Sequence, residues 1–123
     1  MAKFVPDATI DGMLAYVSAN AVNLHVCSTQ PTTYAEAATT YELAVVTIDS
    51  GDFSAANGDV SGRKITVAQQ TGVTIDTGGT AAHIALTNGS DTLYAVTTCS
   101  GVVLSTPGTV TVNAFDIEIT DVA

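Results

Sequence analysis

The chain has 123 residues, of which 46% are hydrophobic and only 12% charged, and its formal net charge is −9. A protein that binds the nucleic-acid backbone needs clustered cations, whereas this sequence offers only Lys3, Arg63 and Lys64. The same balance argues against an anionic membrane surface, and no stretch approaches the roughly 20 apolar residues of a transmembrane helix. We therefore expect neither nucleic acid nor a membrane as a partner.

The length suits one compact domain, and we expect a single β-rich domain over residues 1–123. Thr, Ser, Asn and Gly are abundant, which is typical of sheets and turns. Two cysteines are fewer than a disulfide-built secreted scaffold normally carries. The first seven residues lack the apolar stretch of a secretory signal, so we expect synthesis in the cytoplasm with reduced thiols.

The first predicted element is a helix. Ile10, Met13, Leu14 and Val17 follow the i, i+3, i+4, i+7 spacing of an amphipathic helix. Asp7 stands near its start, where a carboxylate suits the helix dipole. The pattern predicts one helix over about residues 7–19, with these four apolar residues on one face.

After the helix the apolar period changes from 3.6 to 2, which predicts strands. In the first strand, residues 23–28, Leu24 and Val26 share one face. Residues 31–40 form a connector with room for one helical turn. The following segments are a strand at 42–48, a polar loop that includes 49–52 and 57–59, and a strand at 63–69.

The second half of the chain reads as further short strands. Residues 81–87 and 92–99 flank Asn88-Gly89-Ser90-Asp91, which predicts a hairpin with a loop of about four residues. In the last run the apolar parity flips near Asn113-Ala114, so we expect a bulge or bend there. The remaining predicted runs are 73–75, 102–104 and 109–121.

These elements predict a mainly β fold. About 7–8 short strands with frequent turns indicate an antiparallel β-sandwich or small barrel. The single short N-terminal helix would then cover an open end or one face of the sheets.

Two histidines and two cysteines are the candidate metal ligands. His25 and Cys27 share a strand face, and His83 and Cys99 approach each other if their strands are neighbours. The sequence has no C-x-x-C or H-x-x-x-H pair, so we favour ordinary strand residues over a zinc site. Cys27 and Cys99 form a disulfide if their strands are adjacent; otherwise they are two buried thiols.

No pattern in the sequence indicates catalysis. Neither cysteine stands in a glycine-rich turn from a strand to a helix, and neither a Gly-x-Ser-x-Gly nor a P-loop motif is present. Nucleophilic catalysis would also need a base and a third orienting group. We predict that the protein is not an enzyme, with no catalytic, cofactor-binding or metal-binding residues and no cofactor.

The polar loop and the basic pair each allow a binding role and a simpler one. Asp49, Asp52, Asn57 and Asp59 have the composition of a calcium loop without its alternating ligand pattern, so a solvated turn is favoured. The pair Arg63-Lys64 could contact an acidic neighbour, but a charged strand end is the ordinary interpretation.

The terminal strand carries polar and apolar residues on opposite faces. Asp116, Glu118 and Thr120 lie on one face, and Ile117 and Ile119 on the other. The acidic face protects an edge from unwanted pairing or meets a basic partner, and the sequence leaves both readings open.

Several segments together resemble a known family. The N-terminal helix runs into 24–31 (LHVCSTQP), and the stretches 59–64 (DVSGRK), 80–86 (TAAHIAL), 93–97 (LYAVT) and 115–119 (FDIEI) follow. This order, over nearly the whole chain, resembles small virion structural proteins of tailed bacteriophages.

The resemblance implies a capsid decoration (cement) protein that binds the major capsid shell from outside. Such a protein is made in the cytoplasm of the host bacterium and ends in the virion. We expect self-association through the helix or the sheet edges, for example as a trimer. Many equal sites on a shell give avidity, so each contact can be modest.

Two alternatives remain open. The first is a tail, neck or fibre-attachment component of the same virion. The second, from another class, is a ligand- or carbohydrate-binding β-sandwich module. The absence of Trp weakens the sugar-binding reading, since only four tyrosines remain for stacking: Tyr16, Tyr34, Tyr41 and Tyr94.

Overall fold

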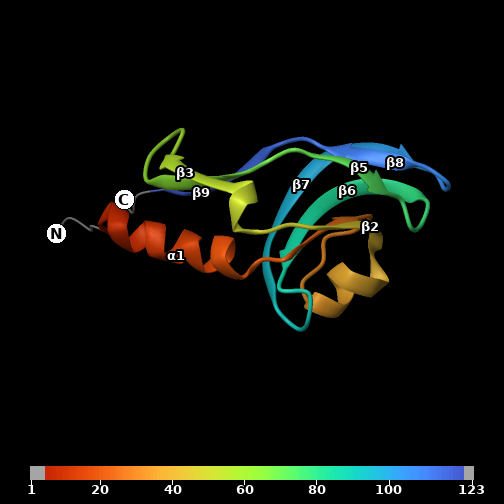
Figure 1. Ribbon diagram of the computed structural model, residues 1–123, viewed down its shortest axis with the longest axis horizontal. Coiled ribbons are helices and arrows are strands. Elements are labelled where there is room, and N and C mark those ends of the chain that lie inside the picture. The colour runs from red at the N-terminus through yellow and green to blue at the C-terminus, as the bar shows by residue number, and fades with distance from the viewer. Residues whose placement is uncertain (1–4, 121–123) are drawn as a thin grey trace.

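The structure, a computed structural model, describes residues 5–120, and nine antiparallel strands and one α-helix are found there (Figure 1). The predicted mainly β fold is confirmed, and the sheets do not close into a barrel. Lys3 and the first residues considered for a targeting signal lie outside the described part of the chain. No helix within residues 5–120 has the length and apolar character needed to cross a membrane.

The elements follow one another in chain order. They are α1 (Asp7–Asn20), β1 (Asn23–Cys27), the π-helical turn η1 (Glu36–Thr40), β2 (Glu42–Thr47), the 3₁₀ turn η2 (Ser50–Asp52), β3 (Phe53–Asn57), β4 (Arg63–Val67), β5 (Gln70–Thr74), β6 (Gly79–Thr87), β7 (Leu93–Leu104), β8 (Thr109–Val112) and β9 (Phe115–Ile119).

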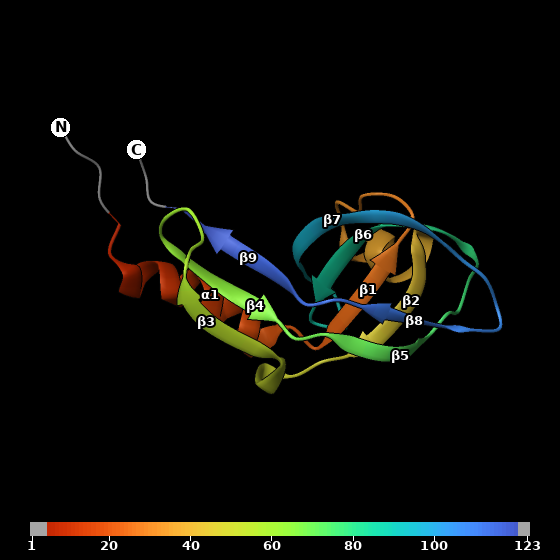
Figure 2. The same ribbon diagram turned by 90° about the horizontal axis from the view of Figure 1, so that it is seen from above.

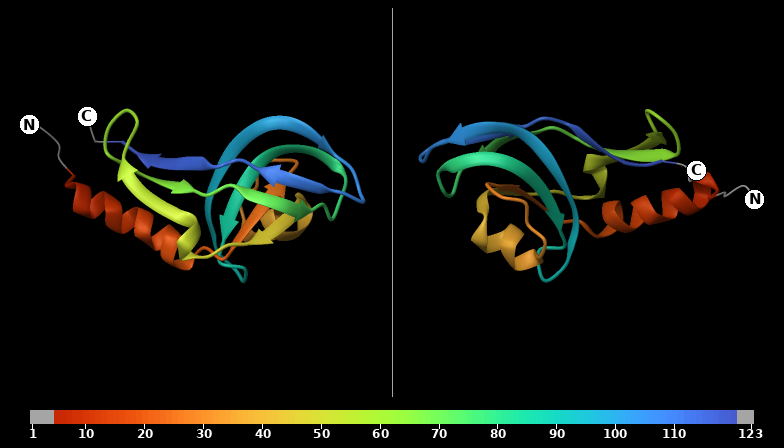
Figure 3. Two further views of the ribbon diagram at one scale, coloured as in Figure 1. Left: turned by 45° about the horizontal axis from the view of Figure 1, so that its top comes forward. Right: turned by 180° about the vertical axis from the view of Figure 1, so that it is seen from behind.

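These elements form two halves (Figures 1 and 3). The sandwich half is the four-stranded sheet β2-β1-β6-β7 together with the two-stranded ribbon β5-β8. The helix half is the three-stranded sheet β3-β4-β9, with α1 along one of its faces (Figure 2). Seen from behind, the helix half projects from the sandwich half (Figure 3).

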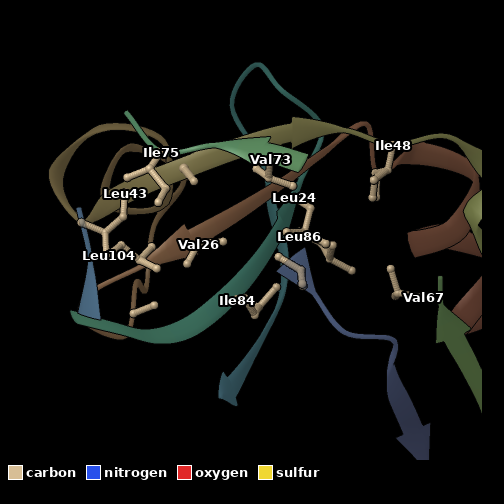
Figure 4. Packing of buried hydrophobic residues seen from close by; sticks show 14 residues of the cluster. Leu24, Val26, Leu43, Ile48, Val67, Val73, Ile75, Ile84, Leu86 and Leu104 are labelled. Atoms are coloured by element: carbon tan, nitrogen blue, oxygen red, sulfur yellow. The ribbon is translucent and has the colours of Figure 1, made fainter. Parts of the chain in front are cut away.

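The core of the sandwich half lies between the four-stranded sheet and the ribbon (Figure 4). Leu24 and Val26 of β1 both point into it, as the period-2 pattern predicts. Leu24 pairs with Val46 on one side and Leu86 on the other, so apolar residues line up across three strands. Full burial of such side chains contributes roughly 1.5–3 kcal/mol each.

The helix is confirmed, and it extends to Asn20. Ile10 and Leu14 are buried against Ile65 of β4, and Val17 packs on both apolar clusters. Met13, expected on the same face, is 47% exposed. The expectation for Met13 is wrong because the three-stranded sheet covers only the side of α1 that Ile10 and Leu14 occupy.

Two pairs of strands run through both halves. β4 continues into β5 and β8 continues into β9, and each pair is interrupted, at residues 68–69 and 113–114. Gln69 Nε2 donates to Asn113 Oδ1 at 3.3 Å across the break. The bend predicted near Asn113-Ala114 is thus confirmed. It lets Val112 face the sandwich core while Ile119 faces the helix.

One strand was missed by the sequence pattern. Residues 53–57, within the expected polar loop, form β3 and pair with β4 from Phe53↔Val67 to Asn57↔Arg63. All residues of β3 after Phe53 are exposed, so the segment lacks the alternation of apolar and polar residues from which a strand is predicted. Pairing with β4 therefore determines this strand.

The expected strands 92–99 and 102–104 are one long strand, β7. Its pairing with β6 shifts between Ala81↔Val102 and His83↔Thr98, so residues 99–101 bulge out of the ladder. A bulge of this kind bends a strand without ending it. The separate strands expected here are wrong for that reason.

The predicted Asn88-Gly89 hairpin connects β6 and β7. Asn88 Oδ1 accepts hydrogen bonds from the backbone N–H groups of Ser90, Asp91 and Thr92 at 2.9–3.0 Å. Gly89 has a φ of +76°, and a Cβ there would lie 2.9 Å from a methyl group of Val22. Both facts favour glycine at the turn.

The helical turn expected in the connector is η1. It covers the outer face of the four-stranded sheet, away from the sandwich core (Figure 1). Cys27, Ala37 and Ala85 are buried between η1 and the sheet, with Tyr41, Leu93 and Val96 around them.

Candidate functional site

The sandwich half contains an open seam between β7 and β8. Its strands follow the order β7-β6-β1-β2-β5-β8, in which the bridge Ala44↔Ile75 joins β2 to β5. Among the described residues β7 pairs only with β6, and β8 only with β5. The two outer edges of this nearly closed ring therefore face each other without a ladder between them.

A cleft of about 300 Å³ occupies this seam. One wall is residues 97–102 of β7, except Gly101, and the other is residues 110–115 of β8, the bend and β9. Val26, Ala81 and Ile84 of the sheet complete the lining. The volume is at the lower end of the range of small-ligand pockets.

The lining of the cleft combines apolar and uncharged polar groups. Its polar side chains are hydroxyls, one amide and one thiol, from Thr97, Thr98, Ser100, Thr111, Asn113 and Cys99. None of the lining residues is charged, although the chain carries a net charge of −9. Val102, which belongs to the lining, is 50% exposed, and the next residue, Val103, is 76% exposed.

The described residues contain one buried polar triad. His25 Nδ1 lies 2.8 Å from Glu42 Oε1, and His25 Nε2 lies 2.8 Å from Thr87 Oγ1. The order hydroxyl, imidazole, carboxylate resembles a hydrolase triad in connectivity. His25 and Thr87 are only 2% and 0% exposed, so the hydroxyl that would attack has no access to a substrate. The triad ties β1, β2 and β6 together.

His83 lies in the same sheet as His25 but has different surroundings. It pairs across the ladder with Cys27 on one side and Thr98 on the other. Its buried Nδ1 atom has no hydrogen-bond partner. The sequence does not distinguish the two histidines, because Glu42 and Thr87 come close to His25 only in the folded sheet.

The two cysteines are both free. Cys27 is fully buried under η1, whereas Cys99 lines the cleft and packs on the sandwich core. β6 separates their strands, and their side chains belong to opposite faces of the sheet. Burial, with smaller contributions from Glu42 and Cys99, raises the pKa of the Cys27 thiol to about 12. Burial also raises the pKa of Cys99.

The acidic loop has structural roles at its two ends. Asp49 and Asp52 cap the η2 turn, where Gly51 N donates to Asp49 Oδ1 and Asp49 N donates to Asp52 Oδ2. Asn57 ends β3 and Asp59 follows in the turn, and they accept hydrogen bonds from Arg63 and Lys64, respectively. The calcium-like residues therefore do not converge on one point.

Both described basic residues contact acidic neighbours within the helix half. Arg63 Nε donates to Asp11 Oδ1 at 2.7 Å and so fastens α1 to β4. Lys64 Nζ lies 2.8 Å from Asp59 and 3.0 Å from Asp116. These bonds raise the pKa of both cations.

The acidic face of the last strand is also used internally. Asp116 accepts from Thr66 Oγ1 at 2.7 Å, and this bond, followed by the Lys64 contact, lowers the pKa of Asp116. Glu118 accepts hydrogen bonds from the backbone N–H groups of Asp59 and Val60 in the β3–β4 turn. Thr120 is exposed beyond the end of β9.

The tyrosines form no common platform for a sugar. Tyr16 of α1 and Tyr94 of β7 contact each other edge to face, with their ring centroids 5.3 Å apart, and so join the two halves. Tyr41 packs under η1, and Tyr34 is half-buried in the same connector.

Within residues 5–120, no three His, Cys, Asp or Glu side chains gather where they could hold a metal ion. The histidine–cysteine set considered above is divided between the outer face of the sheet and the cleft. No family model, curated protein or solved structure matches this chain.

Proposed function

We propose that this protein is a non-enzymatic structural component of a tailed-bacteriophage virion, bound to the outside of the major capsid shell as a decoration protein. The resemblance of its segments to small virion proteins supports the family. The observation that carries the adhesive role is the uncharged cleft, at whose β7 wall Val102 is 50% exposed and the next residue, Val103, is 76% exposed.

The distribution of charge supports this choice of surface. Arg63 and Lys64 already contact carboxylates within the helix half, and several acids cap turns or hold the β3–β4 turn. A net charge of −9 favours solubility of the protein before assembly. An uncharged edge strand is then the place where another protein can approach without desolvating an ion.

The buried triad supports a role without chemistry. His25, Glu42 and Thr87 satisfy one another inside the sheet. Buried polar groups that are fully hydrogen-bonded stabilise one arrangement of strands. We assign the triad to the rigidity that a shell-stabilising protein needs.

The test is the composition of purified particles of the phage whose genome encodes the chain. Quantitative mass spectrometry should find copies of this protein in a fixed proportion to the major capsid protein. Purified protein added to particles that lack it should rebind and raise the temperature at which the shell opens. Absence from the particles contradicts the proposal, and a few copies per particle would replace the decoration role with a neck or tail role.

A further inference from the structure

We infer that the cleft between β7 and β8 accepts an extended, uncharged polypeptide strand from a partner chain, which adds to the β7 edge. The inference deepens the proposed function, on which it rests only for the identity of the donor, a shell subunit. The observations that carry it concern the chain itself.

Two strand edges that face each other, those of β7 and β8, are unpaired among the described residues. Within the described residues, no ladder joins β7 to β8, although each has a partner on its other side. A free strand edge presents a row of backbone N–H and C=O groups at the spacing of a β-ladder. An extended polypeptide matches such a row group by group, and this is the basis of β-strand addition.

The cleft is long enough for a short strand. Its β7 wall extends from residue 97 to residue 102, and its second wall from 110 to 115. At a rise of roughly 3.3 Å per residue, each wall is long enough for a strand of about four to six residues. Residues 99–101 of this wall bulge out of the ladder with β6, and Val102 and Val103, which follow the bulge, are exposed.

The lining of the cleft favours an uncharged occupant. The lining offers hydroxyl, amide and apolar groups but no charge. An acidic segment would be repelled by a chain of net charge −9, and a basic one would find its counter-charges on other surfaces. An ion brought into the uncharged cleft would also lose hydration without a partner. Small, β-branched or hydroxyl side chains are what the cleft accommodates.

β7 lacks charged residues and proline along its whole length, the twelve residues Leu93–Leu104. Edge strands that must stay unpaired usually carry a lysine, an inward-pointing charge or a proline, or are bent by a bulge. Of these devices β7 has only the bulge at residues 99–101. In contrast, the edge strand β9 carries Asp116 and Glu118. Outside this bulge, β7 therefore has the character of an edge that is open to pairing.

Two substitutions from opposite walls test the cleft. Val102→Lys and Thr111→Lys each place a cation in the lining, one from β7 and one from β8. The matched control is Val60→Lys, which adds the same charge at an 85% exposed position in the β3–β4 turn. Thermal unfolding identifies a variant that fails to fold, and the variant on the opposite wall then provides the test.

The probe is a display library of random, unstructured peptides selected against the full chain. Enriched peptides should be uncharged and rich in β-branched residues. Their affinity should fall at least tenfold for Val102→Lys and Thr111→Lys and stay unchanged for Val60→Lys. A selection that enriches no peptide overturns the inference. Peptides that bind all three variants equally, or that are mainly charged, overturn it as well.

The two proposals fail separately. If the protein is absent from particles but the peptides bind in the cleft, the virion role is wrong and the strand-acceptor site stands. If the protein decorates particles and both cleft variants rebind to them like Val60→Lys, the strand-acceptor site is wrong and the decoration role stands.

Discussion

The sandwich half and the helix half are held together by different interactions. Fourteen buried residues form the apolar cluster that fills the sandwich half and reaches Val67 of β4, whereas the cluster of the helix half has only Ile10, Leu14 and Ile65 as buried residues. The three ion pairs that Lys and Arg make within the described residues all lie in the helix half.

The two halves therefore differ in the groups that they leave available for binding. The helix half uses its cations internally, so they are committed to its own stability. The sandwich half is stable through burial and carries the uncharged cleft and the exposed valines. A stable, uncharged seam on a strongly acidic chain is the feature on which the proposed protein partner rests.

The largest expected effect comes from breaking the core of the sandwich half. Leu24→Ala removes a fully buried side chain from the central strand β1 and should lower the free energy of unfolding by about 3 kcal/mol. Val103→Ala, at an exposed position on β7, should change it by less than about 0.5 kcal/mol. Urea denaturation measures both, and similar losses for the two variants would contradict this view of the core.

The next effect sharpens the contrast between the two histidines. His25→Ala leaves Glu42 and Thr87 without their shared partner and should cost about 2–3 kcal/mol of unfolding free energy. His83→Ala removes an imidazole whose buried nitrogen has no partner and should cost less than about 1 kcal/mol. Denaturation curves at neutral pH compare them, and an equal cost would rule out the triad as a stabilising unit.

The two cysteines should differ in reactivity. Below pH 9.0, the ordinary value for a thiol, Cys27 is a buried neutral group in the folded protein and should resist a thiol reagent until the chain unfolds. Cys99, which lines the cleft, should react first. Mass spectrometry of the modified chain gives the order, and fast labelling of Cys27 in folded protein would contradict its burial.

The raised pKa of the Cys27 thiol predicts a loss of stability in alkali. Its pKa is raised to about 12 in the folded state, so its contribution is fully present below pH 9.0 and is lost as the pH rises toward 12. Cys27→Ala should flatten this part of the stability curve, and Cys99→Ala should flatten it less. Identical curves for the two variants would show that Cys27 ionises normally.

The smallest effect concerns the helix half. Arg63→Met removes the bond to Asp11 and should lower the melting temperature by a few degrees at low salt. At about 1 M NaCl the difference from the unaltered protein should shrink, because salt screens exposed ion pairs. Leu24→Ala should show no such salt dependence. A salt-independent loss for Arg63→Met would mean that packing, not charge, fastens α1.

Local patterns predicted much of the fold. The spacing of Ile10, Leu14 and Val17 gave the helix, and the parity flip at Asn113-Ala114 gave the break between β8 and β9. Exposed β3 has no alternation, and the bulge in β7 breaks the pattern of a single strand. These two features depend on pairing with β4 and β6, which periodicity does not encode.

The candidate sites were less predictable for the same reason. The cleft exists because β7 and β8, the outer strands of the six-strand order, face each other without pairing, which is a property of the topology. The His25 triad joins residues from three strands, separated by 17 and 62 positions in sequence. The run Val102-Val103-Leu104 was visible in the sequence, but its exposure on an edge was not.

The most direct test of the adhesive seam is hydrogen exchange of the whole chain, free and bound to particles. Backbone amides in residues 97–103 and 109–113 should exchange more slowly in the bound state, while those of α1 and of the β3–β4 turn should keep their rates. Protection confined to α1 or to the β3–β4 turn, with the seam unchanged, would contradict the account.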